Sequence, residues 1–156
     1  MRALRGLYVT LRNAFRRPAI TVQFPEVVRE RPERYRASFA LLHDEHGEEL
    51  CIGCLACEKI CPSGIISVTA APKRESRVTG KKRGFAADVT IDTVACLTCE
   101  LCVQVCPTDA LVMTRAPERP AEHREELFIT MAKLYENGTA REHGWGTGSR
   151  LMEMQK

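Results

Sequence analysis

The sequence predicts a small α+β domain built from two copies of one structural unit. Residues 51–69, CIGCLACEKICPSGIISVT, align with residues 96–114, CLTCELCVQVCPTDALVMT, at an offset of 45 residues, with four cysteines, a proline and the last threonine in common. The same offset pairs apolar residues at positions suited to packing, namely Ile52/Leu97, Ile60/Val105 and Ile66/Leu111. Because the two halves share both patterns, we expect them to be related by pseudo-twofold symmetry.

The composition is that of a folded protein of ordinary size. The chain has 156 residues, of which 44% are hydrophobic and 28% charged, and this suits one domain with its own core. We find no run of eighteen apolar residues and no secretory signal, so we expect a cytoplasmic location. Thiols stay reduced in that compartment, and the eight cysteines therefore favour a metal site over a disulfide framework.

The cysteine spacing predicts two [4Fe–4S] clusters. Each half has the pattern C-x2-C-x2-C-x3-C-P, in which three cysteines of a tight loop bind one cubane and the fourth binds the other. Small residues such as Gly53 and Ala56 let the loop backbone approach the cluster, and Pro62 and Pro107 redirect the chain after each fourth cysteine. The predicted ligands are Cys51, Cys54, Cys57 and Cys106 for one cluster, and Cys96, Cys99, Cys102 and Cys61 for the second.

Zinc is the main alternative, because paired C-x2-C motifs also form tetrahedral structural sites. Such a zinc-stabilised module could use its basic residues on nucleic acid. We disfavour this alternative because four cysteines in eleven residues, followed by proline, occur twice. We predict no catalytic residue and no substrate turnover by the isolated chain, since dinucleotide, nucleophile and histidine metal motifs are all missing from the sequence. Electron transfer is the predicted function.

Secondary structure is predicted around and after the motifs. Residues 65–69 and 85–91 have the composition of strands, and the charged stretch 71–84 between them suits an exposed loop. Residues 120–135 predict a helix whose apolar positions pack on the body, with Asn137-Gly138 ending it and a flexible tail following. We therefore divide the chain into an arm (1–36), a two-cluster domain (37–119) and a C-terminal helix with its tail (120–156).

The N-terminal arm predicts an amphipathic helix ended by Pro18. Residues 1–36 carry nine arginines against three glutamates, a charge of +6, which leaves −3 of the total +3 for the remainder. The predicted apolar face consists of Leu4, Leu7, Tyr8, Leu11 and Phe15, and Arg5, Arg12 and Arg16 lie on its flank. Arginines beside an apolar face suit a helix on a membrane surface, and packing on the protein's own core is the alternative.

The sequence resembles subunit I of NADH:quinone oxidoreductase, respiratory complex I. The resemblance rests on GLYVTLRNAFRRPAITVQFPE (6–26), RPERYRASFALL (31–42) and the two cysteine motifs, and it covers about residues 5–115. It implies a bacterial two-cluster ferredoxin-like fold with an N-terminal amphipathic helix and a C-terminal helix. It also carries over the eight cysteines as ligands one for one.

The resemblance implies an electron-transfer subunit of a translocase, passing single electrons toward the quinone site. Its partners would be the other subunits and the membrane surface, at the cytoplasmic face of the inner (plasma) membrane, with no nucleic acid. The equivalent subunit of a membrane-bound hydrogenase or a ferredoxin-fed complex is an alternative. The chain departs from the family at Thr98, where an aromatic residue is usual, at Glu100, where a small one is usual, and at GFAADVTIDTVA (84–95) and RAPERPAEHREEL (115–127).

Overall fold

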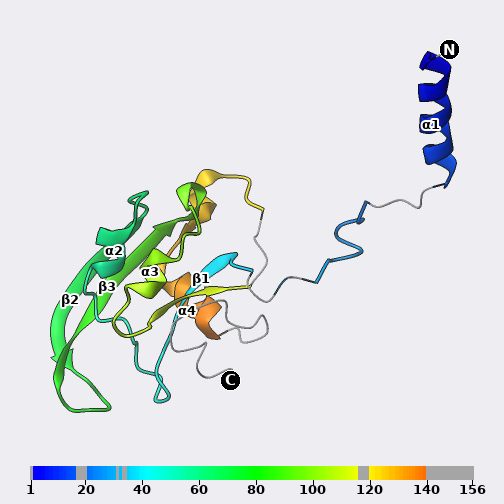
Figure 1. The fold of residues 1–156 in the computed structure, drawn as a ribbon. Helices are drawn as coiled ribbons and strands as arrows, with labels where there is room; N and C mark the ends of the chain where they lie inside the picture. Colours follow the sequence, from blue (N-terminus) through cyan, green and yellow to red (C-terminus); the bar gives the residue numbers. More distant parts are fainter. Residues whose placement is uncertain (1, 17–20, 31, 33–34, 116–119, 140–156) are drawn as a thin grey trace. The chain divides into compact units, whose positions relative to one another are not determined.

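The computed structural model describes residues 2–16, 21–30, 32, 35–115 and 120–139. The chain divides into two compact units, Met1–Arg31 and Pro32–Lys156, which are described separately. Both helices and sheets are present, as the sequence predicts (Figure 1). No helix within the described residues has the length and apolar character needed to cross a membrane. The predicted tail at 140–156 lies outside the described residues.

The first unit contains one helix, α1 (Arg2–Arg16), which confirms the predicted amphipathic helix. Its predicted end at Pro18 lies outside the described residues. The large apolar side chains are exposed, from Val9 at 48% to Phe15 at 84%. Residues 21–30 form a turn near Phe24 and no helix or strand. The helix therefore presents an apolar face that its own unit does not cover.

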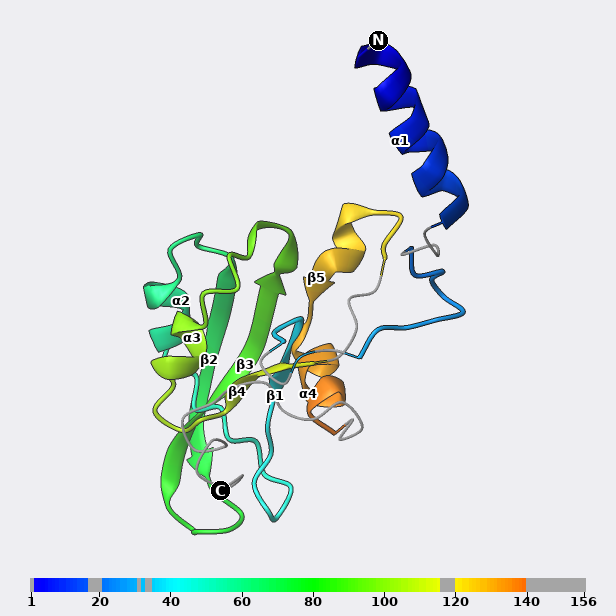
Figure 2. The ribbon, with the colours of Figure 1, turned by 45° about the vertical axis from the view of Figure 1, so that its right-hand side comes forward.

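The second unit combines two small antiparallel sheets with three short α-helices. One sheet pairs β1 (Ser38–Leu41) with β4 (Leu111–Thr114), and the other has the order β2 (Ile66–Glu75), β3 (Lys82–Asp92), β5 (Phe128–Ile129). The helices are α2 (Ala56–Ile60), α3 (Leu101–Gln104) and α4 (Met131–Thr139), and 3-10 turns span Thr93–Ala95 and Arg124–Leu127. Helices α2 and α3 contact each other and lie side by side next to the β2–β3 hairpin (Figures 1 and 2).

One hydrophobic core joins these elements. Ile66 and Val68 of β2 are buried while Ser67 and Thr69 between them are exposed, which is the alternation of a strand with one covered face. Val103 of α3 packs in the same core. The largest side chains with under 2% exposure are Phe85, Leu41, Ile91, Met113, Leu134, Val103 and Val112. Since both motifs end in strands that enter this core, the core fixes the positions of both cysteine loops.

The predicted strands at 65–69 and 85–91 are present, but the predicted loop at 71–84 is largely wrong. Strand β2 continues to Glu75 and β3 begins at Lys82, so only residues 76–81 form the turn. Glu48, far away in the sequence, accepts hydrogen bonds from the Ser76 hydroxyl (2.6 Å) and the Arg77 amide (2.9 Å). This tertiary contact and the continued pairing with β3 order a segment whose composition alone favours a loop.

The predicted helix at 120–135 has the wrong bounds. Residues Arg124–Leu127 form a 3-10 turn, Phe128 and Ile129 pair with the end of β3, and the α-helix begins only at Met131. The Thr93 hydroxyl donates to the Leu127 carbonyl (2.7 Å), which helps to hold this segment along the sheet. Pairing with a free sheet edge has overridden local helix propensity.

The predicted stop at Asn137-Gly138 is also wrong, because α4 continues to Thr139. Asn137 donates a side-chain hydrogen bond to the Phe39 carbonyl (2.9 Å), and a Cβ on Gly138 would collide with the Leu41 carbonyl. Both residues thus serve the close packing of α4 on β1. Leu134 is fully buried there, which confirms the predicted apolar contact with the body.

Candidate metal centre

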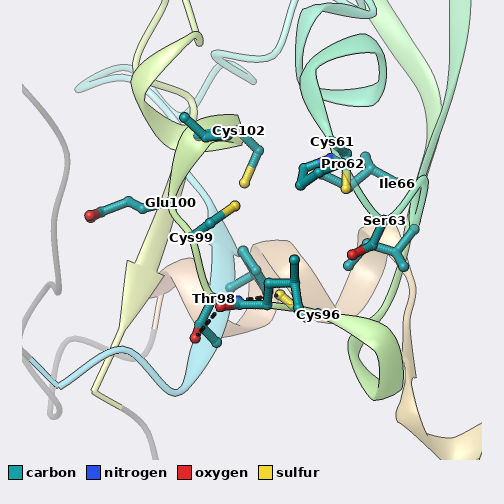
Figure 3. Close-up of a pocket in the computed structure, with 13 residues that line it drawn as sticks. Cys61, Pro62, Ser63, Ile66, Cys96, Thr98, Cys99, Glu100 and Cys102 are labelled. Carbon is teal, nitrogen blue, oxygen red and sulfur yellow. Dashed lines mark hydrogen bonds between the residues drawn. The ribbon is translucent and has the colours of Figure 1, made fainter.

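Four cysteines line each of two cavities in the second unit. The second-motif cavity is lined by Cys61, Cys96, Cys99 and Cys102 together with Phe39, Ile66 and Glu100. Figure 3 shows the sulfur atoms of these four cysteines turned toward a common space, with Cys61 facing the loop that carries the other three. Cys61 comes from the first motif, so this cavity combines three sulfurs of one half with one of the other.

The first-motif cavity repeats this arrangement with the halves exchanged. It is lined by Cys51, Cys54, Cys57 and Cys106, among apolar side chains such as Val68 and Leu111. The structure thereby brings the eight cysteines together in the two sets into which the spacing divides them. Cys54 and Cys99 are exposed, whereas Cys102 is buried.

The two cysteine loops share an unusual backbone conformation. Positive φ angles recur at the 45-residue offset, at Gly53/Thr98 (62° and 50°), Leu55/Glu100 (62° and 68°) and Gly64/Asp109 (60° and 50°). Left-handed backbone turns the chain sharply, which lets three cysteines within seven residues face one cavity. The helices α2 and α3 begin one residue after Leu55 and Glu100, at Ala56 and Leu101.

The first loop packs directly on the backbone of β3. A Cβ on Gly53 would lie 2.6 Å from the Phe85 carbonyl oxygen, and one on Gly84 would lie 2.6 Å from the Ile52 carbonyl oxygen. The close contact therefore requires glycine on both sides, and at Gly53 the positive φ favours it as well. Gly53 was predicted to let the backbone approach the cluster, and its contact with β3 was not predicted. Gly84 was missed, although an isolated glycine near a strand is a known signal for two backbones in contact.

The surroundings of four of the cysteines disfavour the negatively charged thiolate form. Burial, with a contribution from the charge of Cys51, raises the pKa of Cys57 to about 11. Burial, together with the charges of Cys57 and Cys96, raises the pKa of Cys102 to about 12. Burial also raises the pKa of Cys51 and of Cys96, and the charges of Cys106 and Cys61, respectively, add to it. Four thiolates in one cavity therefore need positive charge from a bound group.

Backbone amides point at two of the sulfurs. The Thr98 amide donates to Cys96 Sγ and the Ala110 amide donates to Cys106 Sγ, each at 3.3 Å. Such hydrogen bonds stabilise negative charge on sulfur, whether in a free thiolate or in an iron-bound one.

The residues present fit iron–sulfur clusters. Four thiols line each cavity among largely apolar walls, which is the donor set and the surroundings that a four-iron cluster requires. Among the described residues, no group of three or more His, Cys, Asp or Glu side chains is placed to hold a single metal ion.

Comparison with known proteins agrees with this chemistry. Residues 50–110 match the family model described as a 4Fe-4S dicluster domain. These residues carry a two-cluster iron–sulfur domain. The two motifs of this dicluster domain thus lie on the two cavities described above.

The predicted resemblance to subunit I is confirmed by curated relatives. The chain is 46% identical over 72 residues to NADH-quinone oxidoreductase subunit I 2 of Geobacter sulfurreducens, and 42% identical over 72 residues to subunit I 1 of Geobacter metallireducens. Each match covers 46% of this chain and 40% of the relative, so the matching region spans two fifths of the relatives' length. The homologues indicate an iron–sulfur electron-transfer subunit.

A solved structure is also similar. A chain in the membrane-bound sulfane sulfur reductase, an archaeal respiratory membrane complex, aligns with a TM-score of 0.50 at 29% identity. The alignment covers 76% of this chain and 56% of that chain. The dicluster fold of this protein therefore occurs in more than one kind of respiratory complex.

Proposed function

We propose that the protein is an electron-relay subunit of a membrane-associated NADH:quinone oxidoreductase and passes single electrons through two [4Fe–4S] clusters toward the quinone site. The observation that carries the proposal is the pair of four-cysteine cavities, each lined by three cysteines of one motif and one of the other. A bound cluster supplies one-electron chemistry with little change of geometry. The relatives named subunit I support the choice of complex.

In this proposal the first-motif cavity holds one cluster on Cys51, Cys54, Cys57 and Cys106, and the second-motif cavity holds the other on Cys96, Cys99, Cys102 and Cys61. The repeated left-handed residues support a pseudo-twofold relation between the halves. The protein excludes water with the apolar walls of the two cavities and orients amide hydrogens toward the ligand sulfurs. Contact between α2 and α3 places Cys57 and Cys102 on adjoining helices, which suits electron transfer between the clusters.

The arm supports a peripheral location on a membrane, and the cytoplasmic face is part of the proposal through the resemblance alone. Helix α1 has an exposed apolar face of Leu4, Leu7, Leu11 and Phe15 with arginines beside it. Such a helix lies in the interface between headgroups and acyl chains. In this proposal it is the membrane contact, and the other subunits of the complex are the partners of the two-cluster domain.

A related complex with another electron donor is the second candidate. The similarity to a chain of the archaeal sulfane sulfur reductase complex is the observation behind this candidate, and the membrane-bound hydrogenase and ferredoxin-fed complexes considered above belong to it as well. A zinc-stabilised module that binds nucleic acid is the candidate from another class, and iron and sulfide analysis of the purified protein distinguishes it.

The experiment that tests the function compares electron donors on the native complex. Anaerobic membranes from the source cells are treated with NADH, dihydrogen or reduced ferredoxin, and the paramagnetic resonance signals of this subunit are followed. NADH alone should reduce both clusters within the enzyme's turnover time. Reduction only by ferredoxin or dihydrogen would assign the chain to the second candidate, and colourless protein that contains zinc would overturn both.

A further inference from the structure

An ion pair between a buried carboxylate and a half-buried guanidinium lies at the wall of the second-motif cavity. Arg36 Nη2 is 2.8 Å from Glu100 Oε2, and the side chains are 35% and 7% exposed. Glu100 lies between the ligand candidates Cys99 and Cys102 and lines the cavity. Figure 3 shows its carboxylate directed away from the four sulfurs, so its charge acts on the cavity through space.

The first-motif cavity has an uncharged residue at the corresponding place. Leu55 and Glu100 share the left-handed conformation, precede α2 and α3 respectively, and line their own cavities. The sequence offset and the backbone thus match, while one residue is aliphatic and the other is an acid. At this position the two cavities differ by one full negative charge and by the arginine paired with it.

Stability does not explain the acid at this position. A side chain in the left-handed region costs about 1 kcal/mol relative to glycine. The ion pair also gains little, because the Glu100 carboxylate must be desolvated and the guanidinium of Arg36 stays partly exposed to solvent. In addition, Glu100 Oε1 and Arg36 Nε are buried and have no hydrogen-bond partner in the described residues.

We propose that the Arg36–Glu100 pair sets the reduction potential of the cluster in the second-motif cavity apart from that of its counterpart. This inference rests on the proposed function. Reduction adds one negative charge to the cluster. A nearby carboxylate therefore disfavours reduction, and a nearby guanidinium favours reduction. Glu100 lowers the potential of this cluster, Arg36 raises it, and Leu55 imposes neither effect on the first-motif cluster.

The test is an anaerobic redox titration of the full-length protein with both clusters, followed by paramagnetic resonance. Glu100→Gln keeps the shape of the side chain, leaves Arg36 unbalanced, and should raise the potential of the second-motif cluster. Arg36→Gln leaves the carboxylate unbalanced and should lower it. The double variant should return toward the wild-type value, and the first-motif cluster should shift much less in all three.

A second ion pair provides the matched control. Arg124 Nη2 is 2.8 Å from Asp92 Oδ2, but that pair does not line either cavity, so Arg124→Gln should leave both potentials unchanged. If breaking the Arg36–Glu100 pair changed the potential only by disturbing the packing, Glu100→Gln and Arg36→Gln would shift it in the same direction. Shifts of the same sign, or no shift with both clusters present, overturn the inference. Wild-type protein without iron and sulfide would instead overturn the proposed function.

Discussion

At the scale of single residues, the fourth cysteine of each motif determines how the two halves depend on each other. Cys61 has extended backbone (φ −66°, ψ 114°) and ends α2 just before Pro62, as expected for a residue that precedes proline. Its side chain lies with the cysteines of the second motif, and Cys106 lies with those of the first. Neither cavity is complete without the other half.

The crossed arrangement predicts which variants resemble each other. Cys106→Ala should damage the same cluster as Cys54→Ala, because both remove a sulfur from the first-motif cavity. Cys61→Ala should damage the same cluster as Cys99→Ala. Paramagnetic resonance of the four reduced variants, with iron content as the second readout, checks this.

The four variants control one another, since no prior assignment of either signal is needed. A spectrum of Cys106→Ala that matches Cys99→Ala and differs from Cys54→Ala would show that each motif binds its own fourth cysteine. Equal loss of both signals in all four variants would show that the clusters do not assemble independently of each other.

The two sets of cysteines that line the cavities could be predicted from sequence, because the spacing within each motif is a local property of the chain. The Arg36–Glu100 pair could not, since its members lie far apart in sequence and only the fold joins them. Glu100 was noted as unusual for the family, but a sequence does not show that an acid in a cysteine loop is buried. Gly84 was placed in a loop for the same reason.

At the scale of elements, the first cysteine loop depends on the strand beneath it. The backbone of Ile52 and Gly53 touches that of Gly84 and Phe85 at the start of the buried part of β3. Glu48, just before the loop, holds the hairpin turn through Ser76 and Arg77. The position of Cys51 and Cys54 is thus set by contacts on both sides of the loop.

This dependence predicts a selective effect of Gly84→Ala. The new methyl group would press on the Ile52 carbonyl oxygen, and the loop must move at a cost of about 1–3 kcal/mol. We expect the first-motif cluster to be lost or reduced in occupancy, and the second-motif cluster to remain. Iron content and paramagnetic resonance, compared with Cys54→Ala, measure this outcome.

Gly64→Ala is the matched control. Gly64 has a positive φ of 60°, but a Cβ there would meet nothing within 4 Å, so the variant adds backbone strain without a collision. Both clusters should survive in it. The role of the contact between Gly84 and Ile52 would be contradicted if Gly84→Ala kept both clusters. It would also be contradicted if Gly84→Ala and Gly64→Ala lost the clusters to the same extent.

Element types followed from the sequence more reliably than element bounds. The apolar positions Leu134 and Tyr135 correctly predict a helix that packs on the core. Local propensity could not reveal that Phe128 and Ile129 would pair with the end of β3, because that partner is distant in sequence. The same reason explains why β2 and β3 extend into a segment with loop-like composition.

At the scale of the whole molecule, the chain has two units with different physical character. The first carries arginines and an exposed apolar helix, and the second contains the core and both cavities. The eight cysteines and the core residues all belong to the second unit. In the proposed function, the first unit therefore makes the membrane contact and the second unit carries the electrons.

This division predicts that deleting residues 1–17 leaves both clusters intact and releases the protein from the membrane fraction. The deletion removes the helix that is proposed to contact lipid, and it removes no cysteine and no core residue. Fractionation followed by iron analysis of the soluble protein measures both effects.

A full-length variant with Leu7→Glu and Leu11→Glu is the control for chain length. It places charge on the apolar face of α1 and should be released as the deletion is. Tight membrane association of both variants would show that α1 is not the membrane contact.

The left-handed residues of the two loops have a consequence for maturation of the protein. Leu55 and Asp109 belong to the first-motif cavity, and Thr98 and Glu100 belong to the second-motif cavity, so each cavity has two strained residues that are not glycine. Before any iron is bound, both cavities can relax this strain. We therefore expect neither cavity to be ready for its cluster in the newly made chain. Because each cavity also takes one cysteine from the other half, the two clusters should be inserted together and not in a fixed order.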